Sequence, residues 1–145
     1  MRRAAFGFMT ALAALATGCL NTGPTEATLG EEFELSPNQS ARIAGSELTV
    51  GFRRVVGDNR CPIDVFCLVE GRAGIDLDVF GTAATNPVRF FTPLPASWDD
   101  GTYQIKVLEL LPNPTASRAI KPEDYRVRLV VQLLPGPADL ARDTE

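Results

Sequence analysis

The fold is decided by the stretch YRVRLVVQL, which occupies residues 125–133 near the end of the chain. Its residues alternate between two kinds: Tyr125, Val127, Leu129, Val131 and Leu133 are apolar or aromatic and are separated by Arg126, Arg128 and Gln132. A period of two is the pattern of a β-strand with one buried face and one solvated face. We therefore predict a strand here and look along the chain for its partners.

Alternating or short extended runs recur in five earlier segments, at residues 33–35, 48–53, 75–79, 88–92 and 102–111. Residues typical of turns separate them about every ten positions, and no segment shows a helical period. This pattern predicts an all-β domain over residues 30–135, a single antiparallel β-sandwich, Ig-like or similar. A small β-barrel is the alternative. In the last of the five segments, the predicted common face holds Tyr103, Ile105, Val107 and Glu109.

Tyr125 begins the deciding stretch and directly follows Pro122-Glu123-Asp124. This arrangement is similar to the tyrosine corner of Ig-like sandwiches, in which a tyrosine hydroxyl ties a connecting loop back onto the domain. The alternative is an ordinary core tyrosine whose hydroxyl lies at the rim.

The N-terminus predicts export. Arg2 and Arg3 precede a run of about fourteen apolar or small residues, which is typical of a secretory signal and too short to cross a bilayer core of about 30 Å. The run ends in Leu15-Ala-Thr-Gly-Cys19, which resembles a bacterial lipobox. The resemblance implies that residues 1–18 are removed and that Cys19 carries the lipid, including an acyl chain such as palmitate. A buried N-terminal helix and an ordinary signal with an unmodified Cys19 are the alternatives.

A lipid on Cys19 makes the mature chain a membrane-anchored protein of the cell envelope, because two or three acyl chains hold a protein stably. Residues 19–29 are then the lipidated cysteine and a flexible tether, and residues 136–145 a frayed tail. Leu20 stands where aspartate is the usual inner-membrane retention signal in enteric-type bacteria. We therefore expect the outer membrane, facing the periplasm, or the cell surface.

The cysteine count agrees with export. Once Cys19 is assigned to lipid, Cys61 and Cys67 remain as one pair, and a disulfide is the expected state outside the cytoplasm. A seven-residue ring closed in this way is worth about 2.4 kcal/mol in the chain-entropy model. Five residues between the cysteines do not fit a thioredoxin-like redox motif. Because the chain has no histidine, a tetrahedral zinc site lacks ligands. We expect no metal and no cofactor.

Charge excludes one class of partner. Loss of Arg2 and Arg3 with the signal changes the formal net charge from −4 to −6. An acidic domain with scattered arginines is not a nucleic-acid binder. Because no basic amphipathic helix is visible, the lipid alone is expected to hold the protein on the membrane.

A motif surrounds the cysteine pair. Asp58-Asn59-Arg60-Cys61-Pro62, then Cys67, Gly71 and Ala73, resembles a bacterial family of exported, mostly uncharacterised domains. Its members carry Asp-Ser-Arg-Cys-Pro, four residues, Cys, three residues and Gly-x-Ala. This chain differs by Asn59 in place of serine and by Val69 where tryptophan is common. The family has no established activity, so the resemblance implies an exported domain and no particular chemistry.

The motif predicts a candidate binding loop. Asp58 and Arg60 are placed to hydrogen-bond the loop backbone or each other. The ring would present Ile63, Asp64 and Phe66 in a pre-ordered form, which lowers the ordering cost of binding. The alternative is a rigid corner whose apolar residues are tucked into the core.

Catalytic sites find little support. Without histidine, the Ser-His-Asp and Cys-His arrangements are excluded. The pairs Asp76/Asp78 and Asp99/Asp100 are interpreted as a solvated strand face and a turn, rather than as glycosidase acids or calcium ligands. Trp98, beside this turn, is expected to cap the core edge.

The function predicted from these features is binding without catalysis, to an envelope protein or a glycan. The alternatives are a periplasmic protease inhibitor that presents the Cys61–Cys67 loop, and an enzyme of unrecognised type.

Overall fold

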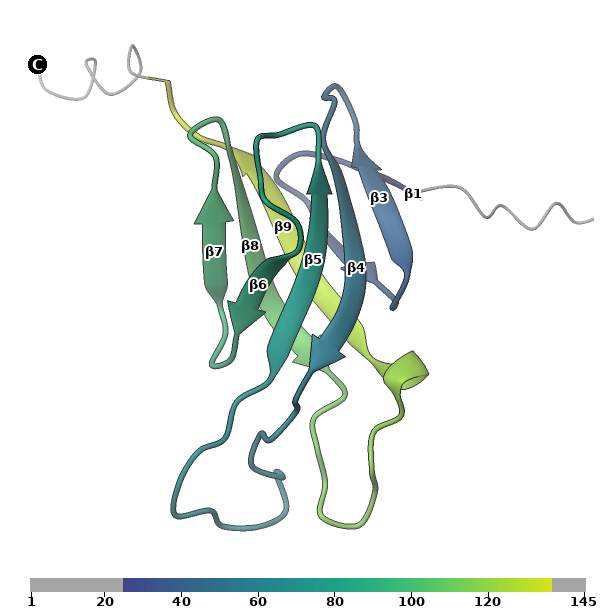
Figure 1. The fold of residues 1–145 in the computed structure, drawn as a ribbon, viewed down its shortest axis with the longest axis vertical. Helices are drawn as coiled ribbons and strands as arrows, with labels where there is room; N and C mark the ends of the chain where they lie inside the picture. Colours follow the sequence, from purple (N-terminus) through teal and green to yellow (C-terminus); the bar gives the residue numbers. More distant parts are fainter. Residues whose placement is uncertain (1–24, 137–145) are drawn as a thin grey trace, which may run out of the picture.

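The computed structural model describes residues 25–136, which form two β-sheets packed face to face (Figure 1). One sheet has the strand order β1-β3-β4-β5-β6 and the other β2-β9-β8-β7. The predicted sandwich is confirmed, and the sheets do not close into a barrel. The elements are β1 (Thr25–Ala27), β2 (Glu32–Leu35), β3 (Gln39–Ile43), β4 (Thr49–Val56), β5 (Gly74–Phe80), β6 (Val88–Phe91), β7 (Ala96–Asp99), β8 (Tyr103–Leu111), the 3-10 turn η1 (Pro122–Asp124) and β9 (Arg126–Leu133).

The core lies between the sheets and is built from the inward residues of the alternating strands. In β9, the deciding stretch, Val127, Leu129 and Val131 are fully buried as predicted, and β9 pairs antiparallel with both β2 and β8. Side chains of this size contribute about 1.5–3 kcal/mol each when fully buried. The other large, fully buried side chains come from both layers: Leu35, Ile43, Leu48, Val50, Phe52, Ile75, Leu77, Val79, Ile105 and Val107.

A β-bulge corrects the predicted face of β8. The register against β9 shifts between Val107 and Glu109, so one extra residue enters the strand. Leu110 therefore takes the inward position and is buried, while Glu109 faces outward and pairs with Arg128. A bulge reverses the alternation downstream of it, and this is why Glu109 does not share the face of Val107.

The domain begins earlier than predicted. β1 pairs in parallel with β3, Ala27 is buried, and the Ala27 carbonyl accepts a hydrogen bond from Ala44 N (2.8 Å). Gly30 N in turn donates to Val131 O (2.8 Å). The prediction of a tether over residues 19–29 is therefore wrong for residues 25–29, which are held by the sheet edge. The signal peptide, Cys19, the start of the tether and the tail from residue 137 lie outside the described residues.

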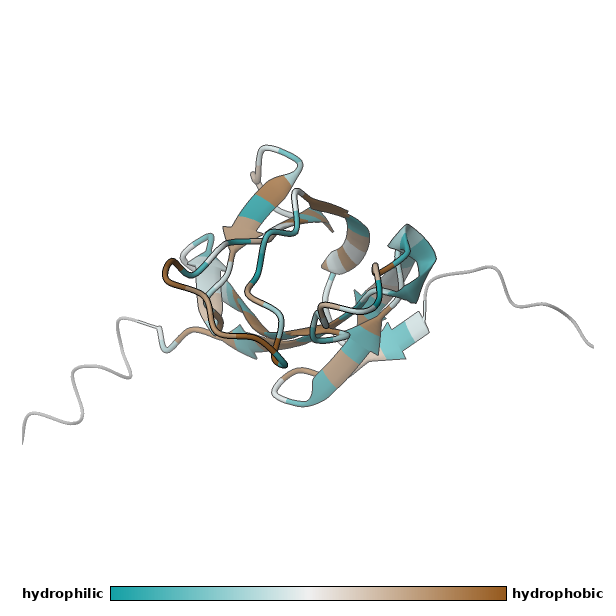
Figure 2. Ribbon diagram, turned by 90° about the horizontal axis from the view of Figure 1, so that it is seen from below, coloured by the Kyte–Doolittle hydropathy of each residue, from teal (hydrophilic) through white to brown (hydrophobic). Residues whose placement is uncertain are grey.

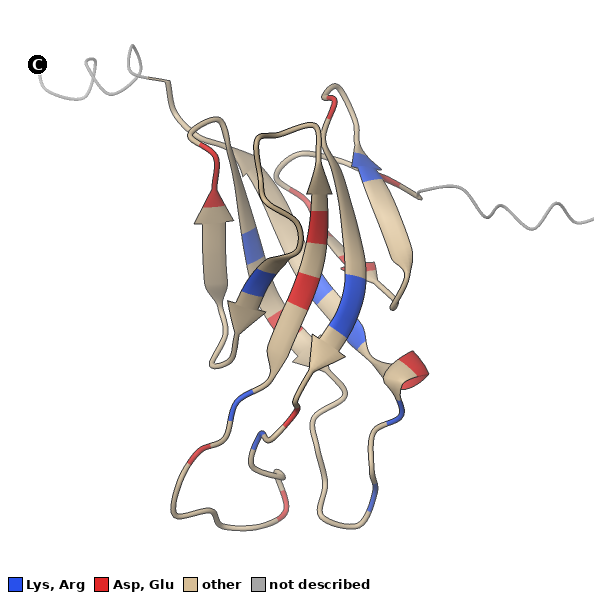
Figure 3. Cartoon of the chain, viewed as in Figure 1, with Lys and Arg blue, Asp and Glu red and all other residues tan. Residues whose placement is uncertain are grey.

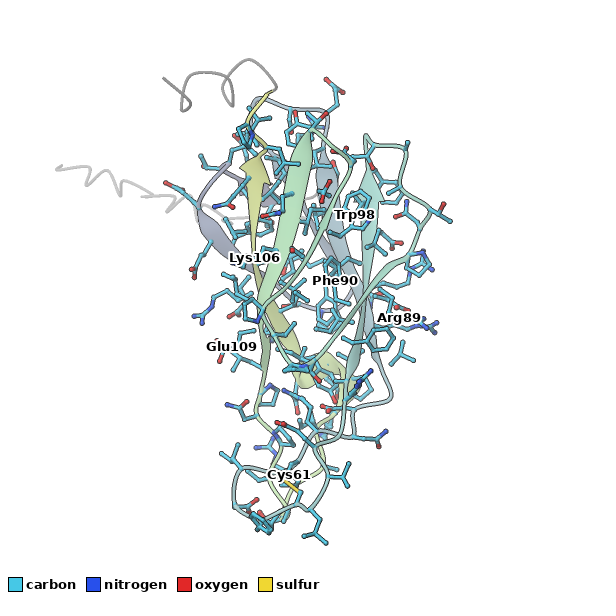
Figure 4. The ribbon with its side chains drawn as sticks, turned by 90° about the vertical axis from the view of Figure 1, so that its left-hand side faces the viewer. Cys61, Arg89, Phe90, Trp98, Lys106 and Glu109 are labelled. Carbon is cyan, nitrogen blue, oxygen red and sulfur yellow. A yellow bond between two sulfur atoms is a disulfide. The ribbon has the colours of Figure 1, made fainter. Side chains whose placement is uncertain are left out.

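Besides β1, two further short strands were not predicted. β3 begins immediately after a turn at Pro37 and Asn38, the latter at φ 64°. β7 forms beside β8, and Trp98 within it packs partly buried against the core, as expected. Figure 4 shows Trp98 and Phe90 on the side of the sandwich where β6 and β7, the edge strands of the two sheets, approach each other.

Two long connections lie at the same end of the sandwich (Figure 1). Residues 57–73 join β4 to β5, and residues 112–121 lead from β8 to η1. Both extend beyond the ends of the strands. Within residues 25–136 there is no helix of the length and apolar character needed to span a bilayer.

Candidate functional site

The cysteine pair forms a disulfide at the far end of the 57–73 connection. Cys61 and Cys67 are bonded, with their Cα atoms 6.1 Å apart, which confirms the predicted ring. Figure 4 shows Cys61 at the end of the molecule, well beyond the sheets. The ring is therefore a projecting feature and no part of the core.

Apolar side chains cover this projection. Phe66 is 90% exposed and Leu68 is 93% exposed, and the neighbouring apolar residues are exposed as well. Figure 2, which looks onto this end, shows the loop coloured as hydrophobic. Among the described residues, five of the eight exposed large hydrophobic side chains lie here, so the core alternative for the ring is excluded. We call this set the apolar tip: Ile63, Val65, Phe66, Leu68 and Val69.

A polar network anchors the base of the tip. Asp58 accepts hydrogen bonds from Arg60 Nε (2.9 Å) at Oδ1 and from Arg60 Nη2 (2.7 Å) at Oδ2, so the predicted pairing is present. The hydroxyl of Tyr125 donates to the same Oδ2 (2.9 Å). The tyrosine therefore ties a connecting loop onto the domain, as a tyrosine corner does. Its partner, however, is a side chain 67 residues away and not nearby backbone.

Arg60 joins the two long connections. Its Nη1 donates to Leu110 O (2.8 Å) and its Nη2 to Pro112 O (3.0 Å). Both Asp58 and Arg60 are largely buried, and charge-assisted bonds of this kind are stronger than neutral ones. The network thus holds the start of the ring against the end of β8.

Burial and hydrogen bonding shift the acidity of this network. Burial alone would raise the pKa of Asp58, but the hydrogen bonds from Arg60 and Tyr125 outweigh it and hold that pKa below the ordinary value. Burial, together with the hydrogen bond to Asp58, raises the pKa of Tyr125 to about 12. At neutral pH the carboxylate is charged and the phenol neutral, so the hydrogen bond between them is fully formed.

The second connection supports the ring directly. Ile63 N donates to Pro114 O (3.0 Å), and Ala116 N donates to Asp64 Oδ1 (2.8 Å). The structure therefore places Asp64, a predicted binding residue, in a contact between the two loops. Behind the ring, Asn59 N donates to Arg72 O (2.8 Å), which closes the connection at its base.

Gly71 of the motif has a steric role. A Cβ built on it would lie 1.5 Å from Asn59 O, far inside any possible contact. The close approach of the two backbone segments therefore requires glycine at this position.

The paired carboxylates are structural. Asp76 was predicted on a solvated face, but it is fully buried: Arg89 covers it through Nε (2.6 Å) and Nη2 (2.9 Å), and Arg54 lies at 3.4 Å. The hydrogen bonds from Arg89 hold the pKa of Asp76 below its ordinary value, against the opposing effect of burial. Figure 3 shows the charged residues side by side on β4, β5 and β6.

The second pair forms the predicted turn. Asp99 accepts a hydrogen bond from Gly101 N (3.2 Å), and Asp100 accepts from Thr102 N (2.8 Å) and Tyr103 N (2.7 Å). Within residues 25–136, no group of three or more Cys, Asp and Glu residues is arranged to hold a metal ion.

The surface of residues 25–136 has several hollows, among them one beside the tip and one on the five-stranded sheet. One of about 330 Å³ lies beside the tip and is lined by Ile63, Leu94 and Leu108 together with Glu70. A second, of about 350 Å³, lies on the outer face of the five-stranded sheet. Neither hollow was predicted from the sequence, because each is lined by residues from several strands or loops.

The chemistry of the tip is that of an apolar contact surface on a rigid support, with a hollow at its side. Comparisons with family models, curated proteins and solved structures found no match to this chain.

Proposed function

We propose that this chain is a lipid-anchored protein of the cell envelope whose domain binds a partner protein through the apolar tip. The observation that carries the proposal is the exposure of Phe66 and Leu68, on a loop closed by a disulfide. Contiguous exposed apolar residues commonly mark interaction sites, because exposure to water is costly and favours aggregation.

The composition of the tip favours a protein over a glycan at this end of the molecule. Its five side chains offer aliphatic and aromatic surface but no hydrogen-bonding groups. A sugar needs donors and acceptors for its hydroxyls, whereas the centre of a protein interface is apolar and often holds an aromatic anchor. Phe66 is the residue we assign as that anchor.

The contacts that hold the tip in place lower the entropy cost of binding a partner. The disulfide, the Asp58–Arg60 pair and the contacts from the 112–121 connection hold the loop before a partner arrives. A loop ordered in advance loses less conformational entropy on association.

The length of the tether limits how far the lipid on Cys19 can lie from the domain. Six residue steps from Cys19 to Thr25 reach at most about 20 Å. Thr25 pairs with Ala41, which pairs with Val50, six residues or about 20 Å before the end of β4. The tip lies beyond that end (Figure 1). The tip therefore lies farther from Thr25 than the end of β4, at or beyond the limit of the tether's reach.

In-cell photo-crosslinking tests the proposal. A photoreactive amino acid is placed at position 66 and adducts are identified by mass spectrometry. We expect one discrete protein adduct. The matched control is the same probe at Leu133, an exposed apolar residue at the opposite end of β9. No adduct from position 66, or the same adducts from both positions, would refute the proposal.

A binding variant gives a second test. Phe66→Asp is expected to abolish recovery of the adduct's protein partner in a pull-down, while the melting temperature changes by less than about 2 °C because the side chain is exposed. Global unfolding of the variant would contradict the assignment of Phe66 to the surface.

A protease inhibitor is the second candidate, favoured by the convex, disulfide-closed ring and its support through Ile63 and Asp64. Such a loop binds a protease as a substrate would but is cleaved slowly or not at all. Rapid cleavage between Cys61 and Cys67 by every envelope protease tried would exclude this function and leave the binding proposal intact.

A further inference from the structure

The outer face of the five-stranded sheet has a second surface unlike the tip. Phe80, the last residue of β5, is 54% exposed on this side. Beside it lies the hollow of about 350 Å³, with Gly51 of β4 in its lining. An aromatic side chain beside a depression on a solvated sheet face has no role in the core.

The floor of the hollow is a row of three paired residues. Gly51 pairs with Ser40 of β3 on one side and with Asp78 of β5 on the other. A Cβ at position 51 would lie 3.5 Å from the Ser40 Cβ and 3.7 Å from the Asp78 Cβ, so it would fit without a clash. Glycine is thus not required sterically. The absence of a side chain at Gly51 leaves its backbone accessible between the side chains of Ser40 and Asp78.

Hydrogen-bonding groups line the hollow. Gln39 Oε1 accepts from Ser36 N (2.9 Å), and within residues 25–136 the two N–H donors of its side-chain amide have no protein partner. In the same described part of the chain, the Ser40 hydroxyl and the side-chain amide of Asn38 have no protein partner, and both residues line the same hollow. The surface therefore offers both donors and acceptors next to an aromatic ring.

The charges of the hollow cancel. Arg53 donates to Asp78 through Nε (3.0 Å) and Nη2 (2.7 Å), so the cation and the anion are paired. An anionic ligand finds no unpaired cation here, and an apolar peptide finds too few apolar walls. Both partners keep free hydrogen-bonding positions at their edges.

We propose that this hollow binds one ring of a neutral polysaccharide. A sugar ring has an apolar C–H face and a periphery of hydroxyls that both donate and accept. The aromatic ring of Phe80 would stack on the apolar face of the sugar. The hydroxyls of the sugar would hydrogen-bond to Ser40, Gln39 and the Arg53–Asp78 pair. The volume is near the lower end of that of small-molecule sites, which suits a single sugar ring. The inference does not rest on the function proposed for the tip.

NMR titration of the full chain tests this inference, with the protein held in a detergent that lacks a sugar headgroup. The probes are cellohexaose, chitohexaose and maltohexaose. We expect saturable shifts at the backbone amides of Ser40, Gly51 and Asp78 with at least one probe, and a Kd on the order of 1 mM.

Two phenylalanines provide a matched pair of variants. Phe80→Ala is expected to weaken binding by about tenfold or more, which is the loss of a stacking surface. Phe91→Ala is the control, because Phe91 lies on the same face, is 51% exposed and does not line the hollow. Ser40→Ala, which keeps the aromatic ring, is expected to weaken binding by about threefold.

Three results would overturn the inference. The first is no saturable shift with any probe up to about 20 mM. The second is binding that persists unchanged in Phe80→Ala with a native spectrum. The third is shifts confined to the 57–73 connection, which would assign the glycan to the tip.

Discussion

The hydroxyl of Tyr125 can be removed without changing the shape of the core. Tyr125→Phe deletes the bond to Asp58 Oδ2 (2.9 Å) and leaves the ring in its buried site. A hydrogen bond to a charged group is worth about 1.5–3 kcal/mol. Asp58 keeps three bonds from Arg60, two from the guanidinium and one from the backbone N (3.2 Å), so the lower value applies. We expect the variant to lose about 1.5 kcal/mol of unfolding free energy, or about 6 °C in melting temperature.

Alkaline pH gives a second test of the same hydroxyl, because burial and the hydrogen bond to Asp58 both favour its neutral form. The pKa of Tyr125 is raised to about 12 in the folded protein, against about 10 in an unfolded chain. The stability that this group contributes is therefore fully present below pH 10 and is lost as the pH rises from 10 to 12. The stability difference between the native chain and Tyr125→Phe should shrink over that range.

The assay is urea unfolding followed by circular dichroism, at neutral pH and in steps up to pH 12. Tyr103 is the control, because it is the only other tyrosine of the chain and its hydroxyl has no partner within residues 25–136. Tyr103→Phe should change the unfolding free energy by less than about 0.5 kcal/mol. A loss below that value in Tyr125→Phe as well would refute the reasoning, since the hydroxyl would then behave as a solvated rim group.

Three further outcomes follow from the packing. Gly71→Ala should destabilise the domain by more than about 2 kcal/mol in urea unfolding, because its Cβ would meet Asn59 O, and an unchanged midpoint would contradict the close approach. Replacing Cys61 and Cys67 by serine should lower the free energy of unfolding by about 2.4 kcal/mol and speed proteolysis of the tip. Equal protease resistance would show that the other contacts are enough to hold the loop. Asp76→Asn should cost about 1–2 kcal/mol at pH 7, since Arg89 loses its carboxylate but can still reach water. Because the folded pKa of Asp76 is lowered, that difference should disappear in acid, as the pH falls below about 4 and through the folded pKa, and a constant difference would argue against the ion pair.

The architecture was predictable because both sheets bury one face. Alternation at Val127, Leu129 and Val131 placed β9, and the same rule placed β2, β4, β5 and β8, whereas β6 was predicted as a short extended run. The disulfide was predictable from the cysteine count, and the pairing of Asp58 with Arg60 from their charges and spacing. These features depend on residues close in sequence or on a regular period.

The structural features that were not predicted depend on contacts between residues distant in sequence. β1 is three residues long and is a strand only because β3 pairs with it. The bulge in β8 shifts the period by one, so Glu109 and Leu110 exchange faces. Asp76 stands at a polar position of its strand and is buried by Arg89 from the next strand along the sheet. Likewise, the partner of Tyr125 is in another loop, and no local motif encodes that contact.

The two proposed binding surfaces lie at different distances from the proposed anchor. Thr25 Oγ1 donates to Ser40 O (3.2 Å), so the sugar hollow is next to the strand on which the tether ends. The apolar tip is farther, beyond the end of β4 (Figure 1). In this arrangement a polysaccharide close to the membrane would meet the sheet face, and the tip would project past it toward a protein. Because the two surfaces share no residue, each can be disabled alone, by Phe80→Ala or by Phe66→Asp, and loss of both activities in either variant would mean that they are one site.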